Sequence, residues 1–194
     1  MENHRLPPSQ VFWIGFGFEA GLLALAAFLG WLLEVLPLPI RFDWDGVLLG
    51  LLGTLPPAIY ALLATSELGL RLSPVRGIYD RIRDLLGEAI AGMALWQLGL
   101  LALAAGFGEE FLFRGVLQVA WGLGTSSVIF ALLHAVTPAY FFMALGLSVY
   151  LGWIFHETEN LLVPSLIHFL YDTLALVLLR RKFREEELER SRRT

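Results

Sequence analysis

The 194-residue sequence predicts an all-α, polytopic membrane helix bundle of about six transmembrane helices with one short interfacial helix. Hydrophobic residues make up 57% of the chain and the mean hydropathy is +0.66, whereas soluble domains are about 45–50% apolar. Charged residues make up only 16%, against about 25% in soluble domains. We therefore expect one integral membrane domain over residues 1–194, with N-terminal spans and a connector (11–88), a core (89–179) and a charged tail (180–194).

Six apolar runs are long enough, or nearly so, to cross a bilayer. They cover residues 11–36, 47–64, 89–120, 125–135, 139–155 and 161–179. The first run is too long for the core of a signal peptide, and Pro37 and Pro39 are expected to end it. Trp44 is a predicted interfacial anchor of the second run, and Pro56-Pro57 predicts a kink inside it.

The connector 65–88 carries four arginines, and its middle, 75–86, has apolar residues at helical spacing. That pattern fits either a short interfacial helix or an ordinary solvated helix. The run 89–120 is either one long helix or two helices broken at 106–108. With one helix, six spans place the connector and the tail on the cytoplasmic side, as the positive-inside rule favours, whereas seven spans place the tail outside. We prefer six spans in a bacterial-type cell membrane, with both termini cytoplasmic.

Two compositional facts exclude whole classes of function. The chain has no cysteine, so disulfides, cysteine nucleophiles and cysteine-ligated metal centres are excluded. The basic residues do not form a stripe with interleaved aromatic residues, so we do not expect the protein to bind nucleic acid.

Three ionisable residues lie inside the apolar run 89–120: Glu109, Glu110 and Arg114. An ionised side chain at the centre of a bilayer costs at least about 2.5–3.5 kcal/mol, so we expect the three to neutralise one another or to serve a function. Glu110 and Arg114 are four residues apart with the acid first, which favours an ion pair on one helix face. Glu109 is rotated by about 100° and has no such partner within the motif. It is therefore a candidate general base.

Further ionisable residues occur in the runs 125–135 and 161–179. His134 follows Phe130 by four residues, so the phenyl ring and the imidazole are expected on one helix face. His168 and Asp172 have the same spacing. Intramembrane ionisable residues normally face the bundle interior and pair with one another. We therefore expect Glu109, His134 and His168 to converge in one polar cavity inside the bilayer.

The motifs Glu-Glu-x-x-x-Arg, Phe-x-x-x-His and His-x-x-x-Asp, in this order on successive membrane segments, resemble the CPBP family of CAAX proteases and bacteriocin-processing peptidases. This family, also called Abi, is related to the Rce-type prenyl proteases. The resemblance covers roughly residues 89–179 and identifies them as a catalytic core. It implies an intramembrane endopeptidase that acts on membrane-associated or lipidated peptides and proteins. The chain departs from the eukaryotic prenyl proteases at Asp172, where they tend to carry Asn.

The resemblance also implies a role for each motif residue. Glu109 and His134 would activate a water molecule, and His168 would stabilise the oxyanion. Asp172 would orient or charge His168, because a carboxylate holds an oxyanion less well than an amide donor does. The positions that would support the site structurally are Glu110, Arg114 and Phe130.

The cofactor remains open from the sequence. Glu109, His134 and His168 could ligate zinc with water in the remaining position, or the same residues could act without a metal, with Glu109 as the base. The expected partners are membrane lipid and a peptide or membrane-protein substrate.

Two other functions remain open at this point: a non-catalytic membrane scaffold or immunity-type protein of the same fold, and a proton or metal transporter. The sequence has no internal repeat, which disfavours the transporter. Four serines lie in or near the apolar runs, but none occupies a Gly-x-Ser-x-Gly motif; they are Ser126, Ser127, Ser148 and Ser165. We therefore expect hydrolysis by an activated water without a covalent intermediate.

Overall fold

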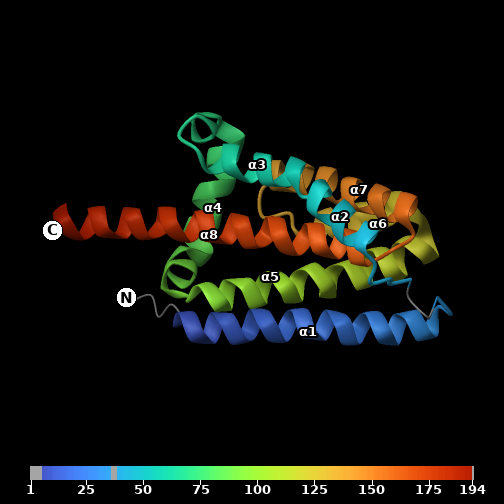
Figure 1. Ribbon diagram of the computed structural model, residues 1–194. Helices are drawn as coiled ribbons and strands as arrows, with labels where there is room; N and C mark the ends of the chain where they lie inside the picture. Colours follow the sequence, from blue (N-terminus) through green and yellow to red (C-terminus); the bar gives the residue numbers. More distant parts are fainter. Residues whose placement is uncertain (1–5, 36–38, 194) are drawn as a thin grey trace.

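The computed structural model describes residues 6–35 and 39–193. Over these residues the chain is helical apart from short connections and contains no strand, which confirms the predicted all-α fold (Figure 1). The helices in chain order are α1 (Pro8–Leu32), α2 (Trp44–Gly53), α3 (Leu55–Thr65), the 3₁₀ turn η1 (Gly69–Arg71), α4 (Ser73–Gly92), α5 (Leu95–Glu110), the π-helical segment η2 (Phe111–Gln118), α6 (Val119–Leu133), α7 (Pro138–Thr158) and α8 (Leu162–Arg193).

Among the described residues, five helical stretches are long and apolar enough to cross a membrane, compared with about six expected from the sequence. The difference arises in the third stretch, Leu95–Leu133, which contains most of the predicted run 89–120 and nearly all of 125–135. Gly122 breaks it, with a φ of 83° that favours glycine. Beyond Gly122, α6 packs back against η2 and α7. Residues 123–133 rise only about 16 Å, so this returning arm is too short to span a bilayer of about 30 Å.

The predicted kink in the second run is present. Helices α2 and α3 meet at Thr54, and Pro56-Pro57 occupies the first turn of α3, where a missing N–H leaves no helical hydrogen bond unmade. The predicted helix end at Pro37 lies outside the described residues. The break predicted as an alternative at 106–108 is absent, because α5 continues through these residues.

The connector and the tail are both more ordered than the sequence indicated. The helix predicted over 75–86 extends from Ser73 to Gly92 as α4, and the next helix starts at Leu95 instead of residue 89. The charged residues after position 179 continue α8 without interruption. Arg180 donates from Nε to the carbonyl oxygen of Met93, and Phe183 is buried against Tyr79 of α4. These contacts dock the end of α8 onto α4.

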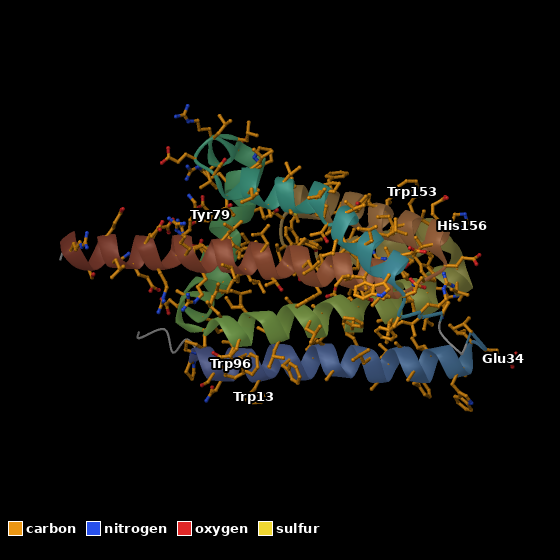
Figure 2. The ribbon with its side chains drawn as sticks, in the orientation of Figure 1. Trp13, Glu34, Tyr79, Trp96, Trp153 and His156 are labelled. Carbon is orange, nitrogen blue, oxygen red and sulfur yellow. The ribbon has the colours of Figure 1, made fainter. Side chains whose placement is uncertain are left out.

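Helix α8 runs through the middle of the bundle, with α5 on one side and α2 and α3 on the other (Figure 1). Helix α4 crosses α8, and α1 packs outside α5. The start of α1 and the end of α8 lie at the same end of the bundle. Exposed tryptophans occur near both ends, with Trp13 and Trp96 at one and Trp153 towards the other (Figure 2). Aromatic belts at both interfaces are typical of integral membrane proteins, which the apolar exposed surface of the helices also indicates.

Candidate active site

The polar core of the bundle begins where α5 becomes the π-helical segment η2. Glu110 and Arg114 are both almost fully buried, with 0% and 1% of their surface exposed. Arg114 Nη1 donates to Glu110 Oε1 over 3.0 Å, so the ion pair predicted from their spacing is present. A π-helical segment is rare and often accompanies functional sites.

Arg114 also fastens η2 to two other helices. Its Nη2 donates to both the carbonyl oxygen and the hydroxyl of Ser148 on α7, each at 3.0 Å. Its guanidinium lies 5.0 Å from the ring centre of Phe130 on α6, within the range of a cation–π contact. From the sequence, Ser148 was considered only as a nucleophile and rejected. Its contact with Arg114 was not predicted, because the two residues are 34 positions apart and no local pattern connects them.

His168 of α8 has carboxylates at both ring nitrogens. Its Nδ1 lies 2.8 Å from Glu110 Oε1, and its Nε2 lies 3.5 Å from Asp172 Oδ2 and 3.8 Å from Glu109 Oε2. Glu110 is therefore shared between Arg114 and His168, and it orients the imidazole as well as neutralising the guanidinium. The predicted helix-face partnership of His168 with Asp172 is also observed.

His134 closes the site from the end of α6. Its Nδ1 lies 2.8 Å from the carbonyl oxygen of Phe130, and its ring stacks on the Phe130 ring with centres 4.2 Å apart. These two contacts direct Nε2 towards Glu109 Oε1, 3.5 Å away. The structure thus brings Glu109, His134 and His168 together, as their shared need for partners inside a membrane predicted.

One site residue was missed by the sequence analysis: Glu19, in the middle of α1. Its carboxylate is partly buried and interacts electrostatically with Glu109, His168 and Asp172. The signal that could have found it was present, since Glu19 lies well inside the apolar run 11–36 and carries the same energetic cost as the glutamates of the motif. Its partners could not be predicted, because the fold alone places α1 beside α5.

A cavity of about 700 Å³ opens beside this polar cluster, between α3 and α4 on one side and α7 and α8 on the other. His134 and Asp172 are the site residues among its lining. Most of the remaining wall is apolar, including Val75, Ile78 and Ile82 of α4. A mostly apolar pocket with a few convergent polar groups is the usual form of a ligand site.

The fit of a metal ion can be judged from the donor arrangement. Across the described residues, no group of three or more His, Cys, Asp or Glu side chains is arranged to hold a metal ion. His168 Nδ1 and one oxygen of Glu110 are already engaged with each other. The Nε2 atoms of His134 and His168, which face Glu109 at 3.5 and 3.8 Å, are the ring nitrogens that a metal ion would have to use. The chemistry below uses the side chains of this chain alone.

The fold and the buried site define an integral membrane protein with a carboxylate–imidazole centre inside its helix bundle. Over residues 91–174 the chain matches the family model described as type II CAAX prenyl endopeptidase Rce1-like, which confirms the family resemblance carried by the three motifs. This segment includes every motif residue from Glu109 to Asp172.

A curated relative, the uncharacterized protein YpbD of Bacillus subtilis, is 44% identical over 77 residues, which cover 38% of this chain and 41% of the relative. The chain thus spans less than half the length of the curated relative that it matches. No solved structure matches the chain.

Proposed function

We propose that the protein is an intramembrane endopeptidase that hydrolyses peptide bonds with a water molecule activated by Glu109 and His134. The observation that carries the proposal is the position of Glu109, which is buried between two imidazoles, with His134 Nε2 at 3.5 Å and His168 Nε2 at 3.8 Å. A buried carboxylate beside imidazoles is suited to general-base chemistry. The match to the Rce1-like family model supports the assignment as a protease.

In the proposed reaction, the side chains of the site can make every proton transfer. Glu109, with His134 Nε2 at 3.5 Å from its Oε1, takes one proton from the water as the water oxygen bonds to the carbonyl carbon of the scissile peptide, and the carbonyl π electrons move to its oxygen. His168, with a carboxylate beside each ring nitrogen, can carry both N–H groups and donate from Nε2 to the oxyanion. The carbon–nitrogen bond then breaks, and Glu109 returns the proton to the leaving amine. The products are a carboxylic acid and an amine.

The cavity beside the site supports the substrate class that we propose. Its apolar lining and its position between membrane helices suit the apolar part of a membrane-associated or lipidated peptide. Such a substrate would enter with its apolar portion along α3 and α4. Its scissile bond would then lie next to His134 and Asp172, the two site residues that line the cavity.

The direct test is Glu109→Gln, assayed by mass spectrometry on a library of lipidated and unlipidated membrane peptides in detergent micelles. The substitution keeps the shape of the side chain and deletes the base, so turnover should fall by about 10²–10⁴-fold while the melting curve stays close to wild type. Glu67→Gln, which changes an exposed carboxylate, is the matched control and should retain full turnover. Equal turnover of the two variants, or no cleavage of any library peptide by the wild type, would contradict the proposal.

Two additional treatments separate the proposed chemistry from its alternatives. A chelator should leave turnover unchanged, whereas loss of activity that is restored by added zinc would establish a metal-dependent mechanism. Serine-directed covalent inhibitors should have no effect. Cation flux through liposomes containing the wild-type protein, in the absence of peptide cleavage, would favour a transporter instead.

A further inference from the structure

Glu19 is the carboxylate of the site whose part in the chemistry is unassigned. It belongs to α1, outside the segment 91–174 that matches the protease family. Its Oε2 is buried and, among the residues that the structure describes, accepts no hydrogen bond. Only 7% of the surface of Glu109 is exposed. Its Oε2 is likewise buried and accepts no hydrogen bond from those residues.

The backbone of α1 approaches α5 closely at this point, because the α5 residue that faces it is a glycine. A Cβ added at Gly108 would lie 2.8 Å from the carbonyl oxygen of Glu19 and 3.5 Å from its Oε2. The Glu19 carboxylate therefore lies beside the residue that precedes Glu109. The two oxygens that lack a hydrogen bond thus belong to carboxylates on stretches of α1 and α5 that pack against each other.

The basic groups of the site are already engaged elsewhere. Arg114 contacts Glu110, His134 contacts Glu109, and His168 contacts three carboxylates, none of which is Glu19. What remains for Glu19 and Glu109 is a ligand with two hydrogen-bond donors that fits between two carboxylates. A water molecule has two O–H donors, and it is the co-substrate of the proposed reaction.

We propose that Glu19 is a positioning residue for the nucleophilic water, which is held between Glu19 and Glu109. This inference rests on the proposed function. Each carboxylate accepts one O–H of the water, which leaves an oxygen lone pair free to attack the carbonyl carbon. During attack, the proton held by Glu109 is transferred to that residue and the oxygen–carbon bond forms. Glu19 retains its hydrogen bond to the second O–H, and with it the orientation of the attacking oxygen.

The kinetic test compares Glu19→Gln and Glu19→Leu with Glu34→Gln in the full chain. Glu34 lies just beyond the end of α1 and points away from the bundle (Figure 2), so its substitution should leave turnover unchanged. Glu19→Leu should lower kcat by about 10²-fold, as expected for a misplaced reactant, with KM little changed. Glu19→Gln should lose less, because its amide oxygen still accepts a hydrogen bond. Unchanged kcat in both Glu19 variants, or a loss confined to KM, would overturn the proposal.

A second measurement does not depend on proteolysis. Infrared difference spectra of the wild type, Glu19→Gln and Glu109→Gln report on the carboxyl vibrations of each residue. If the two carboxylates share a bound water, removing either one shifts the band of the other. Coupled bands in a protein that cleaves no peptide would support the shared water and refute the peptidase. Independent bands in an active protease would refute the role of Glu19 alone.

Discussion

The two halves of the bundle differ in how their interior charges are balanced. In the segment 91–174, each ionisable side chain of the site contacts an oppositely charged or hydrogen-bonding partner from the same segment. The region before it contributes the single carboxylate Glu19 to the site, and its Oε2 has no partner among the described residues. The C-terminal half therefore builds a self-supporting polar network, while the N-terminal half supplies a backing helix and the walls of the cavity.

This difference has a consequence for mutation. Removing a charge within the network takes a partner away from a buried charge, which strongly destabilises the fold. Changes in the N-terminal half should disturb the site through position, with smaller effects on folding.

Arg114→Ala should reduce the free energy of unfolding by about 3–5 kcal/mol, because it removes the guanidinium that neutralises the fully buried Glu110 and leaves that carboxylate only its contact with His168. Thermal melting and folded yield in detergent would measure this. The matched control is Arg181→Ala, which removes an exposed i, i+4 pair with Glu185 and should change stability by about 0–1 kcal/mol. If Arg114→Ala melted like the wild type and lost only turnover, Arg114 would have to be moved from the supporting set to the catalytic one.

Gly108→Ala tests the contact between the two halves. The new methyl group would approach the carbonyl oxygen of Glu19 to 2.8 Å, and overpacking of this kind costs about 1–3 kcal/mol. Turnover should fall as well, because α1 must move away from Glu109. Gly99→Ala in the same helix meets nothing within 4 Å and should be neutral or stabilising by up to about 1 kcal/mol. Similar melting and turnover in both variants would show that the close approach of α1 is unimportant.

Tyr79→Phe should have the smallest effect, about 0.5–1.5 kcal/mol, because it removes a single hydrogen bond of 2.6 Å from the phenol to Glu186. Burial, with that hydrogen bond, raises the pKa of Tyr79 above its ordinary value. The neutral phenol therefore stabilises the fold fully below about pH 10, and this stability is lost as the pH rises further.

Denaturation curves across this range should show the wild type and Tyr79→Phe converging at alkaline pH. Tyr60→Phe is the control, because the hydroxyl of Tyr60 makes no hydrogen bond to any of the residues that the structure describes. A stability difference between the wild type and Tyr79→Phe that persists unchanged above pH 10 would contradict the role of the phenol proton.

Much of the site could be predicted from the sequence because its pairs are local. The spacing of Glu110 with Arg114 and of Phe130 with His134 places each pair on one helix face, and the structure has both contacts. The cost of charge inside a membrane then predicted that the separate motifs would meet, as Glu109 does with His134 and His168. Length and apolar composition similarly determined the helical class of the fold.

Only the tertiary structure decided the contacts between distant segments. The docking of α1 against Gly108 brings Glu19 to the site, and the packing of α7 against η2 gives Arg114 its second partner in Ser148. Gly122 and Gly124 already separate the apolar runs 89–120 and 125–135 in the sequence, and the helix breaks at Gly122. What the tertiary structure adds is the packing of the short α6 back against η2 and α7. Hydropathy and helical spacing describe each segment along its own axis, whereas the side-by-side order of helices depends on close approach between surfaces that are equally apolar.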